Sequence, residues 1–144
     1  MSGIQDSLDE LADEFDLLSD WEERYRYVIE LGGTLEPLSD AERSEANKVR
    51  GCASQVWLVT EPQGDGTVRF RGDSDAHIVS GLIAVLLRLY SGRTPGEILA
   101  FDPKAAFERL GLSGALSTQR SNGLASMAAR IRRDAEALDA ANRP

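Results

Sequence analysis

The chain has 144 residues, 42% of them hydrophobic, which suits one domain, 1–144, built around a single core. Its net charge of -8 argues against nucleic acid as a partner, because phosphate binding needs a basic surface. No stretch approaches the ~18 apolar residues of a membrane span, and the acidic first twenty residues are unlike a signal segment, so we expect a soluble, cytoplasmic protein with no membrane partner.

Two helices are predicted in the first third of the chain, which is also its most acidic part. Residues 1–50 hold 14 acids and 5 bases. Apolar residues at helical spacing predict a helix over 5–18, and a capping box of Ser19 and Glu22 predicts a second helix that ends at Gly32. The acidic surface either steers a basic partner or is simply a solvated face.

The only cysteine of the chain, Cys52, follows Gly51 and comes just before an apolar, strand-like run. An ionised thiol is the most nucleophilic side chain near neutral pH, but free cysteines are also often buried as small hydrophobes. Lys48 and Arg50 are candidates to stabilise a thiolate, and Ser54 is a candidate to donate a hydrogen bond to it. One cysteine cannot form an internal disulfide, which fits a reducing compartment.

The residues around and after the cysteine predict a small antiparallel sheet. A strand is expected over 55–60, a turn over 62–66, and a second strand over 67–71 in which apolar and basic residues alternate. A third short strand around 48–50 would complete a sheet of about three strands. Together with the helices, this sheet predicts an α+β fold.

The second half of the chain is predicted to be helical. An almost wholly apolar helix, capped by Asp73 or Ser74, is expected to run to about Tyr90 and to be the central buried helix. Two short helices are expected to begin at Thr94 and Asp102, because each is followed by a proline at the first helical position.

A long last helix is expected to open at Ser117. Gly123 costs this helix ~1 kcal/mol, and close packing of another backbone against it would explain its presence. Arg120 lies in the first turn, where the helix dipole disfavours a cation. Either a carboxylate or anion partner offsets that cost, or the arginine is exposed.

The chain contains one cysteine and one histidine, and this composition excludes several kinds of site. Metal sites need clustered ligands, and one cysteine and one histidine cannot supply a zinc or iron–sulfur site. His77 is conceivable as a partner of Cys52, although a lone histidine is more often structural. What remains is a one-thiol carrier: Cys52 attacks an electrophilic sulfur and holds it as a persulfide, as in thiol–disulfide exchange. Such a carrier needs no cofactor and no metal.

Four sequence blocks, in this order, point to a known family. Residues 21–25 read W-E-x-R-Y, residues 49–57 read V-x-G-C-x-S-Q-V-W, residues 72–82 contain G-D-S-D-A and then I-V-x-G-L, and residues 116–124 read L-S-x-x-R-x-x-G-L. These blocks resemble the SufE proteins, the sulfur acceptors that work with cysteine desulfurases. One departure lies at residues 35–38, where the family usually has two prolines.

The resemblance implies a SufE/IscU-like α+β fold in which the small sheet packs against several helices. It implies two partners: a cysteine desulfurase (SufS- or CsdA-like) that donates sulfur to Cys52 and is stimulated in return, and an iron–sulfur scaffold complex that accepts the sulfur. Pyridoxal phosphate belongs to the desulfurase. The candidates for supporting or interface roles are Lys48, Arg50, Gly51, Ser54, Asp75 and Arg120.

Two alternatives to a sulfur carrier stay open from the sequence. One is a non-catalytic regulator that binds the desulfurase and uses Cys52 only for packing. The other is a single-cysteine thiol redox protein, which would form a sulfenate with peroxide. For the carrier we further expect that Gly51 acts as a hinge, so that the loop switches between a sheltered and an exposed state.

Overall fold

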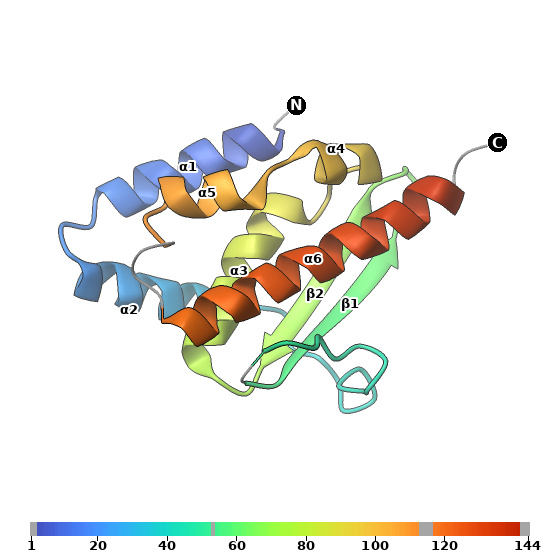
Figure 1. The fold of residues 1–144 in the computed structure, drawn as a ribbon, viewed down its shortest axis with the longest axis horizontal. Coiled ribbons are helices and arrows are strands. Elements are labelled where there is room, and N and C mark those ends of the chain that lie inside the picture. Colours follow the sequence, from blue (N-terminus) through green and yellow to red (C-terminus); the bar gives the residue numbers. More distant parts are fainter. Residues whose placement is uncertain (1–2, 53, 113–116, 142–144) are drawn as a thin grey trace.

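The computed structural model describes residues 3–52, 54–112 and 117–141 of the chain. Along these residues two helices precede a small sheet, and the remaining helices follow it (Figure 1). In chain order the elements are α1 (Ile4–Asp16), α2 (Trp21–Gly32), β1 (Val56–Pro62), β2 (Val68–Ser74), α3 (His77–Tyr90), α4 (Pro95–Ala100), α5 (Pro103–Arg109) and α6 (Thr118–Ala141). The α+β class expected from the sequence is confirmed.

The sheet consists of β1 and β2, paired antiparallel from Val56 opposite Ser74 to Pro62 opposite Val68. The expected third strand is wrong for the described residues, because Lys48 forms only an isolated bridge with Trp57. The pairing cannot extend, since a turn precedes it, with the N–H of Lys48 donating to the carbonyl of Glu45 at 3.3 Å.

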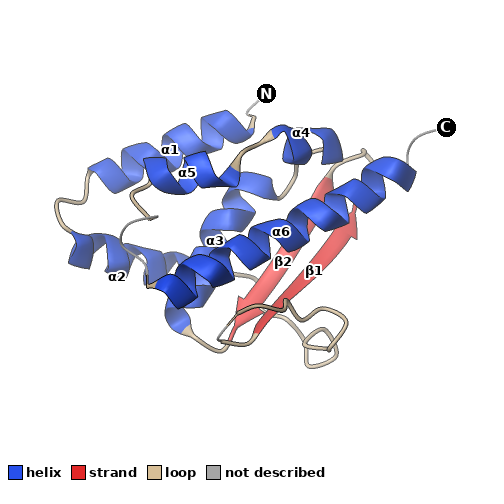
Figure 2. Cartoon of the chain, viewed as in Figure 1, coloured by secondary structure: helices blue, strands red, loops and turns tan. Residues whose placement is uncertain are grey.

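Helix α3 lies at the centre of the fold and contacts α1, α2, α6 and β2 (Figure 2). Its buried residues run from Ile78 to Tyr90, as the apolar sequence predicts. The helix begins later than expected, with Ala76 as its N-cap. Asp73 and Ser74 instead end β2, and the Ser74 hydroxyl accepts a hydrogen bond from the N–H of Ala76 at 3.2 Å.

The predicted starts of α4 and α5 are confirmed, and that of α2 needs one correction. Helix α2 is capped by Asp20, not Ser19, because the Asp20 carboxylate accepts the N–H of Glu23 at 2.9 Å. Thr94 caps α4 where that helix was expected to begin and forms a capping box with Glu97, and Asp102 caps α5 through the N–H of Lys104 at 3.0 Å.

One ion pair links three of the helices. The Glu14 carboxylate of α1 accepts hydrogen bonds from Arg88 of α3, one of them at 2.9 Å, and from the hydroxyl of Tyr27 of α2. The hydrogen bond from Arg88 holds the pKa of Glu14 below its usual value. A carboxyl group whose pKa is lowered by folding stabilises the fold above its unfolded pKa, and this contribution is lost as the pH falls through the folded pKa.

Glu14→Gln should therefore lower the free energy of unfolding at pH 7, by about 1 kcal/mol or less because the pair is partly exposed. The difference from the wild type should shrink as the pH falls below about 4. Urea denaturation at several pH values measures it. Asp13→Asn, on the same helix and without an ion pair to a described residue, is the control. An equal loss in both variants, or one that persists in acid, would contradict the role of the pair.

Candidate functional site

The candidate site is built on the loop that carries Cys52, whose described residues 50–52 and 54–55 lie between the end of the sheet and α6 (Figure 1). The N–H of Val49 donates to the carbonyl of Val56 at 2.8 Å and joins the two ends of the loop. The Asp75 carboxylate accepts the N–H of Gln55 at 3.0 Å. The loop is therefore anchored on both sides of the cysteine, and Asp75 acts on the loop through the backbone.

The middle of the loop lies directly on α6. Gly51 has φ +90°, and a Cβ there would lie 2.5 Å from the hydroxyl oxygen of Ser126. A Cβ on Gly123 would lie 3.6 Å from Sγ of Cys52 and 3.9 Å from its Cα. The thiol of Cys52 donates a weak hydrogen bond to the carbonyl of Gly123 at 3.6 Å. The loop therefore packs against Gly123, but the expectation that close packing of a backbone requires a glycine there is wrong, because a Cβ would make only ordinary contacts, the nearest of them with Sγ of Cys52.

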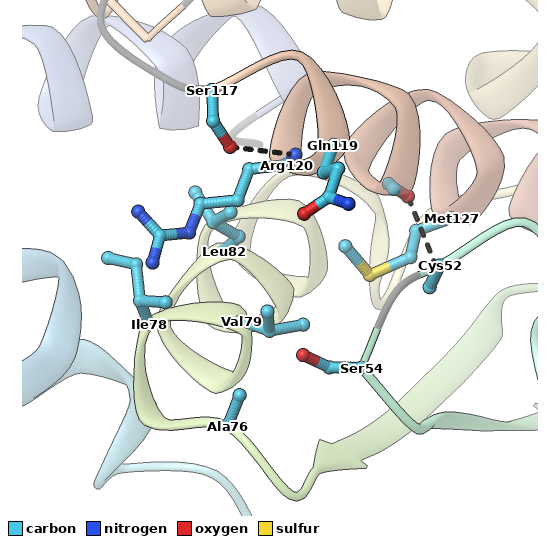
Figure 3. A pocket seen from close by; sticks show the side chains of 11 residues that line it. Cys52, Ser54, Ala76, Ile78, Val79, Leu82, Ser117, Gln119, Arg120 and Met127 are labelled. Atoms are coloured by element: carbon cyan, nitrogen blue, oxygen red, sulfur yellow. Dashed lines mark hydrogen bonds between the residues drawn. The ribbon is translucent and has the colours of Figure 1, made fainter.

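Cys52 lines a pocket of about 300 Å³ that α3 and α6 border (Figure 3). The apolar side chains that line it are Ala76, Ile78, Val79, Leu82 and Met127. The polar side chains are Ser54, Ser117, Gln119 and Arg120. The structure therefore brings Ser54 and Arg120, two of the candidates from the sequence, together with the thiol.

Arg120 faces the pocket from the side opposite Cys52 (Figure 3). Its guanidinium carbon lies 5.9 Å from the centre of the Tyr25 ring, a cation–π contact. No carboxylate of the described residues lies within 4.0 Å of the guanidinium. The first-turn cation is therefore partnered by an aromatic ring, and its N–H groups are available to a group in the pocket.

Burial raises the pKa of the Cys52 thiol above its usual value, because an anion is poorly solvated at this half-buried position. Lys48 and Arg50, expected as thiolate stabilisers, do not line the pocket. Arg50 instead pairs with Glu45 at 3.0 Å. Among residues 3–52, 54–112 and 117–141, no cation offsets the effect of burial on the pKa of the thiol. His77 is exposed at the start of α3 and is not part of the pocket lining.

Several site residues escaped the sequence reasoning. Gln119 and Met127 lie one helical turn on either side of Gly123 and share its face, so helical spacing from Gly123 was the signal for them. Arg130 is a positioning residue, since its guanidinium donates to the carbonyls of Lys48 and Ala46, each at 3.3 Å. Nothing local in the sequence indicates this contact, because it spans 82 residues.

The described residues were compared with the requirements of a metal site and of a membrane-spanning helix. Residues 3–52, 54–112 and 117–141 include no group of three or more His, Cys, Asp or Glu side chains that could hold a metal ion. In the same ranges no helix has the length and apolar content needed to cross a membrane.

Comparison with known proteins decides the family. The model of the SufE family, described as an Fe-S metabolism associated domain, matches residues 9–135. The chain belongs to the SufE family. An uncharacterized SufE-like protein of Rhizobium etli is 54% identical over 138 residues, which is 94% of this chain and 93% of the relative. A second, of Rhizobium meliloti, is 50% identical over 133 residues, 90% of this chain and 95% of the relative.

The fold is shared with a solved structure, that of a hypothetical protein from Thermus thermophilus. The likeness has a TM-score of 0.75 at 20% identity and covers 92% of this chain and 95% of the other. Membership in the SufE family places the protein in iron–sulfur metabolism and in the sulfur transfer that serves it, with cysteine desulfurases as the general class of partner.

The two loop–helix contacts predict opposite effects of alanine. Gly51→Ala should destabilise the protein by at least about 1 kcal/mol, because a left-handed φ is unfavourable for alanine and the added Cβ would collide with Ser126. Gly123→Ala should be neutral or stabilising by up to about 1 kcal/mol, since its Cβ would make only an ordinary contact with Cys52. Urea denaturation measures both.

The control for this pair is Gly51→Ala combined with Ser126→Ala. It removes the collision but not the unfavourable φ, so it should recover only part of the lost stability. A destabilised Gly123→Ala variant together with an unaffected Gly51→Ala variant would contradict the packing described here.

The thiol of Cys52 should titrate above the value of about 8.5 that is usual for a free cysteine, because burial opposes the thiolate. The rate of alkylation by iodoacetamide, followed from about pH 7 to about pH 10.5 around that reference value, gives the apparent pKa. The same measurement in urea provides the reference for the exposed thiol. An apparent pKa in the folded protein below that reference would mean that a cation reaches the sulfur.

Proposed function

We propose that Cys52 accepts sulfur from the persulfide of a cysteine desulfurase and carries it to an iron–sulfur scaffold complex. The observation that carries the proposal is the position of the thiol, half-buried at the side of a pocket of about 300 Å³. An added sulfur atom is about the size of a water molecule, whose share of liquid volume is about 30 Å³. The pocket therefore has room for the carried sulfur.

The proposed transfer is a thiol exchange on sulfur. The thiolate of Cys52 attacks the terminal sulfur of the donor persulfide, a new S–S bond forms on Cys52, and the S–S bond of the donor breaks. The donor cysteine leaves as a thiolate, so no oxidant or reductant is consumed. By clearing the persulfide from the desulfurase, the carrier frees that enzyme for its next turnover, which accounts for stimulation.

Accepting sulfur requires the thiolate and a path to the donor, and the half-buried position of Cys52 opposes the first and restricts the second. Burial keeps the thiol protonated, and the thiol is the unreactive form. The loop would open by rotation at Gly51, which breaks the contacts of Gly51 and Cys52 with α6. The anchors at Val49 and Gln55 would keep the motion local.

The closed position of the loop, with Cys52 against α6, suits the protein while Cys52 holds a persulfide. A persulfide held in the pocket would lie among Ser54, Gln119 and Arg120. Arg120 supplies a positive charge for a persulfide anion, and the apolar wall limits the approach of water and other thiols. We assign to these three residues the retention of the sulfur and not its transfer.

The two alternatives predict different behaviour of the thiol. A regulator that uses Cys52 only for packing would keep its effect on the desulfurase when the sulfur atom is replaced. A redox protein needs a low-pKa, accessible thiol to react with peroxide, whereas burial raises the pKa of Cys52. The carrier also needs the thiolate, so the raised pKa does not separate these two functions, and the gain of sulfur on Cys52 is the result that does.

Incubation of the protein with a cysteine desulfurase and free cysteine should add the mass of one sulfur atom to Cys52. Mass spectrometry of the intact protein and of its peptides measures the gain, and a thiol reductant should remove it. Cys52→Ser should gain no sulfur and should lose stimulation of the desulfurase. Full stimulation by Cys52→Ser would support the regulator, and absence of any gain by the wild type would reject the carrier.

A further inference from the structure

We infer that a basic patch beside the cysteine loop docks an acidic segment of the sulfur-donor protein. The patch is a hollow of about 270 Å³. Its cationic side chains are Lys48, Arg50, Arg130 and Arg133. This inference rests on the proposed function, because it names the surface by which the donor reaches Cys52.

The charges of the patch are only partly neutralised. Arg50 pairs with Glu45 at 3.0 Å, and Arg130 pairs with Asp134 at 3.2 Å. Within the described ranges no carboxylate lies within 4.0 Å of the ammonium of Lys48 or the guanidinium of Arg133. Like charges gathered around one hollow repel one another, and an anionic partner relieves that repulsion.

The patch adjoins the Cys52 pocket across α6. Ser126, Arg130 and Arg133 line the patch, while Gly123 and Met127 line the pocket. These two sets occupy neighbouring faces of the helix, since successive residues are about 100° apart.

The loop crosses from one of these faces to the other. Arg50 lines the patch, Gly51 lies against Ser126, and Cys52 lies against Gly123. A partner seated on the patch therefore touches the chain next to the proposed hinge. Docking would bring the donor to the position where release of the loop presents the sulfur.

The exposure of the patch favours a protein segment as its occupant. The side chains of Arg50 and Glu45 are each 76% exposed, and Arg133 is also exposed, so the hollow is an open surface and does not enclose an ion. The net charge of -8 opposes approach to extended polyanions such as nucleic acids or anionic membranes. A short run of Asp and Glu on a protein complements the local positive charge, and it is shorter than an extended polyanion, so less of it meets the acidic remainder of the molecule.

The test reverses the two unpaired cations in the double variant Lys48→Glu/Arg133→Glu. Stimulation of a cysteine desulfurase from the same organism is measured against the concentration of the SufE protein. The half-saturating concentration should rise about tenfold at low salt with the maximal rate unchanged, because docking charges act on association. The difference should vanish near 1 M salt, where the screening length is about 3 Å.

The matched control is Arg26→Glu/Lys104→Glu, which makes the same change of net charge at exposed positions of α2 and α5. It should behave as the wild type. If the two double variants have the same half-saturating concentration, the patch is not the docking surface. A lower maximal rate with an unchanged half-saturating concentration would also contradict docking at the patch. If the wild type gains no sulfur on Cys52, the proposed function fails instead, which the mass measurement reports separately.

A peptide of glutamates only, about the length of a short acidic run, serves as a direct probe of the occupant. It should compete with the desulfurase for the wild type and not for Lys48→Glu/Arg133→Glu. Free glutamate at the same residue concentration tests for a small-anion site. Equal competition by free glutamate, or none by the peptide, contradicts docking of an acidic segment.

Discussion

The packing of the cysteine loop against α6 is the contact on which the site depends. Gly123 has no side chain, so Cys52 rests directly on the helix backbone, with Sγ 3.6 Å from the carbonyl oxygen. Gly51 supplies the φ of +90° that turns the chain onto the helix. Of the two glycines, Gly51 is the one that the turn requires, because at Gly123 a methyl group would make only an ordinary contact with the loop.

The same contact shelters the thiol and opposes its ionisation. Half-burial raises the pKa of Cys52, and the apolar wall from α3 and α6 limits the access of water. A carrier of labile sulfur needs this protection between transfers and must lose it during them. The anchoring of the loop at Val49 and Gln55 would confine such an opening to the loop and leave the rest of the fold unchanged.

The acidic first fifty residues and the basic patch differ in the sign of their charge. The first fifty residues contain 14 acids and 5 bases, yet Lys48 and Arg50 from that segment fold against Arg130 and Arg133 of α6. The acidic composition disfavours polyanions as partners, and the local basic patch favours an acidic protein surface next to the thiol. Net charge alone conceals this arrangement, since it sums over both surfaces.

The sequence by itself determined the class of fold, the family and the identity of the candidate reactive atom. Helical periodicity, capping residues and the alternating strand are local properties, so α3, the capping box at Thr94 and the β1–β2 hairpin could be read from the order of residues. The block around Cys52 marked the family. Errors fell where local signals compete, as at Ser19 and Asp20, which are adjacent N-cap residues of nearly equal propensity.

Only the tertiary structure decided what surrounds the thiol. Whether Arg120 or Arg50 lines the pocket of Cys52 depends on how α6 crosses the loop. Cys52 contacts Gly123 of that helix although 71 positions separate them, and nothing in the sequence marks this contact. Neighbouring residues on the loop, Arg50 and Cys52, face different hollows because Gly51 turns the chain between them. Sequence proximity suggested Arg50 as the cation near the thiol, whereas packing places Arg120, and not Arg50, in the lining of the pocket that Cys52 shares.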